Sequence, residues 1–222
     1  MSLLTQLVNL FFSQRRGEID FFMQHPVRLE RLLTQAGGTV FGREHGFDKI
    51  RTSEAYAAAV PVADYDSFSE YIGRTRTGEQ NVLWPTEIKW FAKSSGTTSA
   101  KSKFIPVSDE GLSGCHLRGP MDVVCFFAGL YPKSGVFGGR TLTLGGSHRL
   151  ESTGGRAQEG DLSAILIENT PKWASWRRTP RPETALIPDF EEKVQAICRE
   201  AVPQRVTSFA GVPSWNLVLM NR

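Results

Sequence analysis

Apolar residues recur at the spacing of one helix face in two long segments of the chain. Residues 3–15 carry leucines and a phenylalanine three, four, seven and eight positions apart, and residues 190–201 hold a similar pattern. This periodicity predicts an amphipathic helix in each segment, with its apolar face against a core. A further helix is expected over residues 18–35, because Gly37 and Gly38 follow it and glycine is favoured where helices end.

Short apolar runs between the helical segments predict strands. We expect four of them, over residues 88–92, 104–107, 141–144 and 206–209. Ser108 follows the second run, and its hydroxyl can cap a helix that continues to about Ala128. Pro213 is expected to open a last helix, because proline is tolerated at the first helical position.

The remaining segments are shorter or less regular. A helix is expected over residues 67–74, with Asp66 or Ser67 as its N-cap. Residues 161–168 form either a helix or another buried segment, since their apolar run has no decisive period. Residues 171–188 are rich in proline and are expected to be an irregular connection. Helices thus alternate with short strands in the second half, which predicts an α/β fold of layered helices and small mixed sheets.

Composition narrows the class of protein. The chain has 222 residues, of which 40% are hydrophobic and 22% are charged, and this excludes a disordered tail, a collagen-like chain and a disulfide-stapled miniprotein. The net charge of +3 is too small to favour a nucleic-acid partner. No apolar run approaches the roughly 18 residues that a membrane span needs, so no membrane partner is expected.

The three cysteines favour a reducing compartment. Cys115, Cys125 and Cys198 are an odd number at wide spacings, which suits neither a disulfide framework nor a metal site. In the first residues the basic pair follows the apolar part, the reverse of a secretory signal. We therefore expect a cytoplasmic protein that holds no metal ion in a cysteine or histidine site.

A polar loop between the first two predicted strands carries the clearest chemistry. Ser94, Ser95, Thr97 and Thr98 supply four hydroxyls around Gly96. Glycine lets the backbone approach a ligand closely, so hydroxyls and amide groups can donate to phosphate oxygens together. Either of the two lysines that follow, Lys101 or Lys103, can add a compensating charge.

Three interpretations of this loop compete. It can be a solvated turn rich in serine and threonine. It can be a Walker-type loop, but the spacing from Gly96 to Lys101 is one residue short, Ala100 replaces the second glycine, and a strand follows instead of a helix. It can also be the phosphate loop of adenylate-forming enzymes, a hairpin of the form S-[ST]-G-[ST]-T-G-x-x-K, which fits Ser94 to Thr98 and Lys103.

The loop and its flanks resemble one known family. The stretch KSSGTTSAKSKFIP at residues 93–106 is similar to the auxin-responsive promoter family, the Gretchen Hagen 3 acyl-acid amido synthetases. Further segments of the chain resemble the same family, the last three of them its bacterial members: residues 47–50, 60–66, 145–148, 160–163 and 211–215.

The resemblance implies a fold and a reaction. The fold would be the N-terminal part of the large domain of an acyl-adenylate-forming enzyme. The reaction would use ATP and Mg²⁺ to activate a small-molecule carboxylic acid as an acyl-adenylate and then join it to an amino acid. Ser94, Ser95, Gly96, Thr97 and Thr98 would bind the ATP phosphates, with Lys103 as the closing lysine. Ala100 stands where the family usually has glycine, and it would impair the loop if that position needs a positive φ.

The resemblance also suggests residues on the side of the acid. Val212 and Pro213, with Trp215, resemble the segment that precedes the acyl pocket in related ligases, although core packing explains them as well. His148 lies in a glycine-containing loop that can contact substrate, or it is an ordinary loop histidine. Arg118 can face a substrate carboxylate, or it can point to solvent. No catalytic residue is assigned.

Length leaves the activity open. Family members are longer, and their later motifs for adenine, ribose and the second half-reaction do not occur in residues 1–222. We therefore expect this chain to be a partial N-terminal large domain without the C-terminal domain. The alternatives are an acyl-CoA or aryl-CoA ligase-like enzyme and an inactive truncated fragment that binds nucleotide.

Overall fold

The computed structural model describes residues 3–24, 28–94, 102–146, 150–153 and 156–222. The chain divides into two compact units, which we describe separately. The first, the hairpin unit, holds Gly17–Cys115 and Glu151–Glu159. The second, the parallel-sheet unit, holds Met1–Arg16, His116–Leu150 and Gly160–Arg222.

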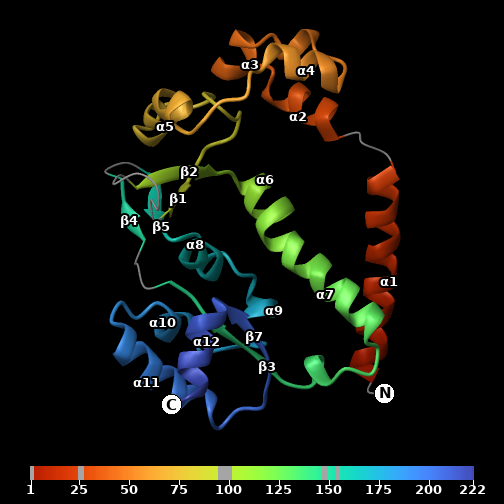
Figure 1. Ribbon diagram of the computed structural model, residues 1–222, viewed down its shortest axis with the longest axis vertical. Helices are drawn as coiled ribbons and strands as arrows, with labels where there is room; N and C mark the ends of the chain where they lie inside the picture. The colour runs from red at the N-terminus through yellow and green to blue at the C-terminus, as the bar shows by residue number, and fades with distance from the viewer. Residues whose placement is uncertain (1–2, 25–27, 95–101, 147–149, 154–155) are drawn as a thin grey trace. The chain divides into compact units, whose positions relative to one another are not determined.

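Short helices make up much of the hairpin unit (Figure 1). Leu33 and Ala36 of the first helix are buried together with Phe47 and Ile50, and this cluster joins that helix to the 3-10 turn at residues 47–49. Buried Thr39 caps one helix by accepting a hydrogen bond from Gly42 N, at 2.9 Å. The elements in chain order are α2 (Arg28–Ala36), α3 (Val40–Glu44), η1 (Phe47–Lys49), α4 (Ser53–Ala59), η2 (Asp66–Phe68) and α5 (Ser69–Arg76).

A four-stranded sheet forms the second part of this unit, in the order β2-β1-β5-β4. Its first two strands make an antiparallel hairpin whose register runs from Trp90 opposite Val107 to Ser94 opposite Lys103. Phe91, fully buried, packs with other apolar side chains under the sheet. The strands are β1 (Trp90–Ser94), β2 (Lys103–Val107), β4 (Glu151–Ser152) and β5 (Gln158–Gly160).

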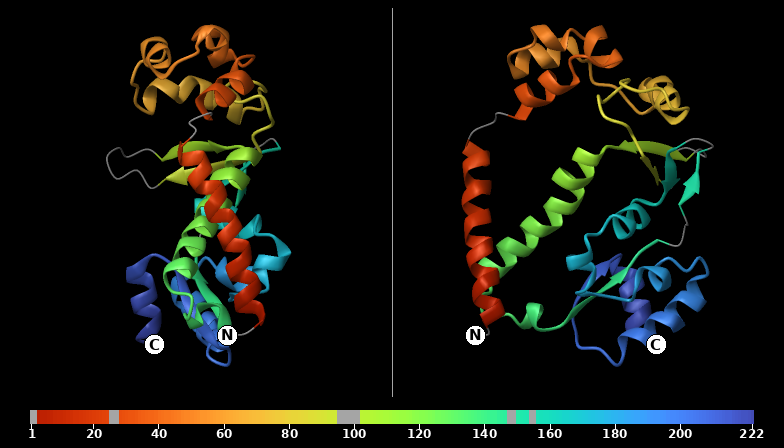
Figure 2. Two further views of the ribbon diagram at one scale, coloured as in Figure 1. Left: turned by 90° about the vertical axis from the view of Figure 1, so that its right-hand side faces the viewer. Right: turned by 180° about the vertical axis from the view of Figure 1, so that it is seen from behind.

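Three consecutive helical segments follow β2: α6 (Asp109–Gly111), η3 (Leu112–Leu117) and α7 (Arg118–Leu130). Ser108 caps the first of them, accepting from Gly111 N at 2.9 Å, as the sequence predicts. In the parallel-sheet unit, the N-terminal half of α1 (Leu3–Gln24) lies beside the C-terminal half of α7 (Figure 2). Arg15 holds the two helices together through two hydrogen bonds to the Asp122 carboxylate, at 2.8 and 3.1 Å.

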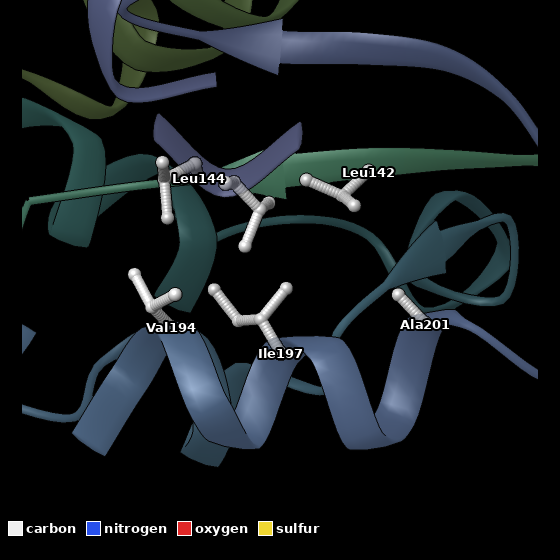
Figure 3. Close-up of a cluster of buried hydrophobic side chains, with 6 residues drawn as sticks. Leu142, Leu144, Val194, Ile197 and Ala201 are labelled. Atoms are coloured by element: carbon white, nitrogen blue, oxygen red, sulfur yellow. The ribbon is translucent and has the colours of Figure 1, made fainter. Parts of the chain in front are cut away.

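The parallel sheet has the order β6-β3-β7. β3 is central, and both neighbours run parallel to it. Figure 3 shows Leu142 and Leu144 of β3 directed toward Val194, Ile197 and Ala201 of α11, which covers this face of the sheet. The elements are η4 (Gly135–Gly138), β3 (Arg140–Leu144), α8 (Leu162–Glu168), α9 (Lys172–Ser175), β6 (Arg178–Thr179), α10 (Pro182–Ala185), α11 (Phe190–Ala201), β7 (Val206–Gly211) and α12 (Pro213–Met220).

The α/β fold predicted from the sequence is confirmed, and most elements lie within two residues of their expected bounds. The helices expected over residues 3–15 and 18–35 are wrong where they meet: α1 continues to Gln24, and a separate α2 begins at Arg28. Proline lacks an amide hydrogen and clashes with the preceding turn, and Pro26 stands in the sequence between these two helices.

Two smaller expectations are also corrected. Neither Asp66 nor Ser67 is an N-cap: η2 and α5 have no side-chain cap, and it is the Asp64 carboxylate, two residues before Asp66, that accepts from Ser67 N at 3.1 Å. Residues 171–188 are more ordered than an irregular connection. They contain α9, α10 and a short strand, β6, whose Thr179 pairs with Leu142 of β3.

Candidate functional site

The candidate phosphate-binding loop is flanked by two strands that pair with each other. Ser94 is the last residue of β1 and Lys103 the first of β2, and the two are direct partners in the ladder. Directly opposed residues of an antiparallel pair place their side chains on the same face of the sheet. The Ser94 hydroxyl and the Lys103 ammonium therefore start from one face, at the base of the loop. Ser95, Gly96, Thr97 and Thr98 lie outside the described residues, as do Ala100 and Lys101.

Tyr65 holds the outer strand of this hairpin. Its phenol oxygen accepts a hydrogen bond from Phe104 N at 2.9 Å and donates one to Phe104 O at 3.3 Å. The Lys103 ammonium lies 5.4 Å from the centre of the Tyr65 ring, within the range of a cation–π interaction. Sequence reasoning missed Tyr65, although it lies in one of the segments that resemble the family.

Arg76 packs on the ring of Phe104, the residue that follows Lys103 in β2. Its guanidinium carbon lies 3.8 Å from the centre of the Phe104 ring, and its Nη2 donates to Glu159 of β5 at 2.6 Å. Arg76 thereby links β2 to the other side of the sheet. Beside it is an open groove of about 560 Å³ with both charge signs in its walls, lined by Thr75, Arg76, Gly78, Gln80, Glu87, Ile88, Arg156 and Ala157.

In the parallel-sheet unit, the ends of β3 and β7 come close together at Leu144 and Gly211. Gly211 pairs with Leu144 and adopts φ +146°, and a Cβ at this position would lie 2.5 Å from Leu144 O. Only glycine therefore fits there without displacement. The carboxyl ends of parallel strands meet at one edge, which is where α/β folds usually bind ligands.

A buried lysine fixes the turn after β3. Lys193 of α11 is 1% exposed and donates to the carbonyl oxygens of Gly145 and Gly146, at 3.3 and 3.2 Å. Gly146 N donates to Ser163 Oγ at 2.8 Å. Burial lowers the pKa of Lys193, and the nearby Asp161 carboxylate partly opposes this shift. Sequence reasoning missed Lys193, although a lysine at a core-facing position of the predicted helix was a signal.

The residues expected on the acid side are only partly described. Arg118 is exposed at the start of α7. Val212 is 46% exposed and Pro213 opens α12, as predicted. Trp215 instead packs against the apolar core, with its ring 6.1 Å from that of Phe190, so core packing explains it. His148 lies outside the described residues.

Within the part of the chain that the structure describes, no group of three or more His, Cys, Asp or Glu side chains could hold a metal ion. In the same residues, no helix combines the length and apolarity required for crossing a bilayer. Cys115, Cys125 and Cys198 are free thiols.

Comparisons with known proteins agree on one family. A sequence model of the GH3 family N-terminal domain matches residues 23–219. A probable indole-3-acetic acid-amido synthetase GH3.12 from Oryza sativa subsp. japonica is 26% identical over 179 residues, 75% of this chain and 28% of the rice protein. The jasmonoyl--L-amino acid synthetase JAR6 from Nicotiana attenuata is 31% identical over 83 residues, 37% of this chain and 14% of the Nicotiana protein.

Solved structures give the same picture of the fold. A structure of GH3.15 acyl acid amido synthetase matches with a TM-score of 0.69 at 18% identity, covering 87% of this chain and 34% of that one. A structure of the AtGH3.15 enzyme in complex with 2,4-DB matches with a TM-score of 0.70 at 20% identity. The chain therefore spans about a third or less of the length of these relatives.

Proposed function

Because the chain belongs to the GH3 family, we propose that it supplies the phosphate-binding hairpin of an ATP-dependent ligase that joins a carboxylic acid to an amino acid. Residues 1–222 would be part of the large N-terminal domain, with the C-terminal domain outside them. The partners would be small molecules, and the protein would act in the cytoplasm. The observation that carries this proposal is the pairing of Ser94 with Lys103 at the base of a loop with the family's phosphate-binding sequence.

The first step would activate the acid. A carboxylate oxygen attacks the α-phosphorus of ATP, and the bond between that phosphorus and the oxygen bridging to the β-phosphate breaks. Pyrophosphate leaves, and an acyl-adenylate remains. Hydroxyl and amide donors of residues 94–98 would hold the β- and γ-phosphates, while the Lys103 ammonium offsets the negative charge that grows on the leaving pyrophosphate. Fixed donors of this kind act mainly by positioning and electrostatic stabilisation.

The second step would form the amide. The amino group of the amino acid attacks the acyl carbon, the bond from that carbon to the AMP oxygen breaks, and the ammonium proton passes to solvent or a base. Mg²⁺ would arrive with ATP as part of the substrate, neutralising its phosphate oxygens. In the hairpin, the hydroxyls and the Lys103 ammonium would supply hydrogen bonds and charge to the same phosphate oxygens.

The acid would be recognised by other residues. We assign Arg118 to its carboxylate before activation and Val212, Pro213 and His148 to its surroundings. The relatives act on indole-3-acetic acid or form jasmonoyl conjugates according to their names, and one solved relative holds 2,4-DB. Ring-bearing carboxylic acids of this kind are therefore the first substrates to test.

Nucleotide binding by the chain tests the central claim. Titration calorimetry with ATP and Mg²⁺ should give saturable binding, weakened about 10- to 100-fold by Lys103→Met, since a hydrogen bond to a charged group contributes about 1.5–3 kcal/mol. Lys49→Met removes an exposed lysine of η1 and should leave the affinity unchanged. If ATP fails to bind, or binds the Lys103→Met variant equally well, the proposal is wrong.

A second assay separates the alternatives. The chain is incubated with ATP, Mg²⁺ and indole-3-acetic acid, jasmonic acid or 2,4-DB, and pyrophosphate is measured, followed by mass analysis after adding amino acids or coenzyme A. An acyl amide supports the amido synthetase, and a thioester supports the CoA ligase alternative. ATP binding without pyrophosphate release from any acid supports a nucleotide-binding fragment without activity.

A further inference from the structure

We propose that Tyr65 is a positioning residue for phosphate binding at the β1–β2 hairpin: its hydroxyl fixes β2 at Phe104, and its ring holds the ammonium of Lys103. This inference rests on the proposed function for its consequence, although the geometry belongs to the hairpin itself. Tyr65 immediately precedes η2 and is remote in sequence from the strand that it contacts.

The Tyr65 hydroxyl satisfies backbone groups of β2 that a neighbouring strand would otherwise bond. β2 is at the edge of its sheet, so one side of its backbone has no strand partner. The Tyr65 oxygen accepts from Phe104 N at 2.9 Å and donates to Phe104 O at 3.3 Å. A phenol has one hydrogen and two lone pairs, so it can make both bonds at once. Both backbone polar groups of Phe104 are thereby satisfied one residue after Lys103.

The ring acts on the lysine itself. Lys103 Nζ lies 5.4 Å from the ring centre, a cation–π distance. A ring face does not take up all three hydrogens of an ammonium group, so those directed away from the ring remain available for phosphate oxygens. The ring is held in turn, since Tyr65 packs against the buried cluster of Ile72, Ile88, Phe91 and Ala157. A core-supported ring therefore orients a long and otherwise mobile side chain.

Ordering the lysine before the ligand arrives should raise affinity. A lysine side chain loses much rotamer freedom when it is immobilised in a complex. If Tyr65 already restricts those rotamers, less freedom is lost when the phosphates bind. Tyr65 would then contribute to binding without touching the nucleotide, and its entire contribution would pass through Lys103 and the β2 backbone.

A double-mutant cycle measures this path. We would titrate the full chain with ATP and Mg²⁺, and with inorganic tripolyphosphate, for wild type, Tyr65→Leu, Lys103→Met and the double variant. We expect Tyr65→Leu to weaken binding about three- to tenfold in the wild-type background and less than about twofold in the Lys103→Met background. Tyr56→Phe, at another partly buried tyrosine of the same unit, is the matched control. An equal loss in both backgrounds, or no loss in a folded Tyr65→Leu variant, would overturn the proposal.

Nuclear magnetic resonance tests the geometry without any nucleotide. In protein with ¹³C-labelled lysine, the Lys103 methylene signals next to Nζ are assigned by their absence in Lys103→Met. Their upfield ring-current shift should persist in Tyr65→Phe and disappear in Tyr65→Leu. In Tyr65→Phe, the Phe104 amide hydrogen should exchange faster. With these shifts present but no ATP binding, the proposed function fails and the seating of Lys103 stands; without them in wild type, the positioning role is wrong.

Discussion

Ser94 and Lys103 are opposite partners at the open end of the β1–β2 ladder. The two residues flank the segment for which we propose phosphate binding. The two strands are secured by core packing of Phe91 and by the bonds from Tyr65 to Phe104. The backbone positions of Ser94 and Lys103 are therefore fixed by core packing and hydrogen bonds of the two strands.

Ser94 should contribute a hydroxyl to phosphate binding. Ser94→Ala removes one neutral donor, so we expect the dissociation constant for ATP and Mg²⁺ to rise about 2- to 10-fold, corresponding to about 0.5–1.5 kcal/mol. Titration calorimetry measures the change. Ser113→Ala, at an exposed helical serine of the same unit, provides the control and should leave the constant unchanged. Equal affinity of Ser94→Ala and wild type would remove Ser94 from the site.

Lys193 should make stability depend on pH. Burial lowers its pKa in the folded protein, whereas an unfolded lysine titrates near about 10.4. Between these two pKa values the unfolded chain binds more protons, so the free energy of unfolding rises with pH. We expect the unfolding free energy of wild type minus that of Lys193→Met to increase from about pH 7 toward about pH 10.

Urea denaturation at several pH values measures this difference. Lys49→Met, at an exposed position, supplies the baseline for removing a lysine that is not buried. A difference that falls with rising pH would show that the folded state favours the charged form of Lys193, contrary to the argument from its burial.

The contact between β3 and α11 should dominate the stability of the parallel-sheet unit. Ile197 is fully buried against Leu142 and Leu144 (Figure 3). Ile197→Ala should lower the free energy of unfolding by about 2–5 kcal/mol, because it removes buried methyl groups and leaves a cavity. Val202→Ala, at an 82% exposed position just after the same helix, should change it by less than about 0.5 kcal/mol. Similar losses for the two variants in urea denaturation would contradict this.

Thr39 should be needed for its hydroxyl. Its oxygen accepts from Gly42 N at 2.9 Å and donates to Ala36 O at 2.7 Å, fully buried. Thr39→Val keeps the shape but leaves both groups without this partner, so we expect a loss of about 1–3 kcal/mol. Thr39→Ser keeps the hydroxyl and should retain most of the stability. Thermal or urea unfolding of the two variants decides, and equal stability would refute a capping role.

The sequence predicted those features that repeat over short distances. The apolar positions of residues 190–201 recur at helical spacing, and α11 has those bounds. The strands around the phosphate loop were found because apolar runs flank a polar segment, and Ser108 was found because it stands directly before a helix. In each case the signal and the structure lie within a few residues of one another.

The missed features depend on partners remote in the chain. β6 has two residues, Arg178–Thr179, too few to show a period, and it exists because β3 pairs with it. The Tyr65 hydroxyl bonds to the backbone of Phe104, which is 39 positions away in the sequence. The Lys193 ammonium bonds to the backbone of Gly146, which is 47 positions away. No local pattern contains such information, because these side chains acquire their roles only when the fold brings them to Phe104 and Gly146.

The parallel pairing of β3 with β7 sets an order of events during synthesis. The elements from β4 to α11 separate Leu144 from its partner Gly211, whereas only residues 95–102 separate β1 from β2. A nascent chain leaving the ribosome can therefore close the hairpin long before the central parallel strand acquires both neighbours. Until α11 and β7 have been synthesised, Leu142 and Leu144 of β3 lack the partners that bury them in the folded unit, and exposed apolar surface of this kind favours aggregation and chaperone binding.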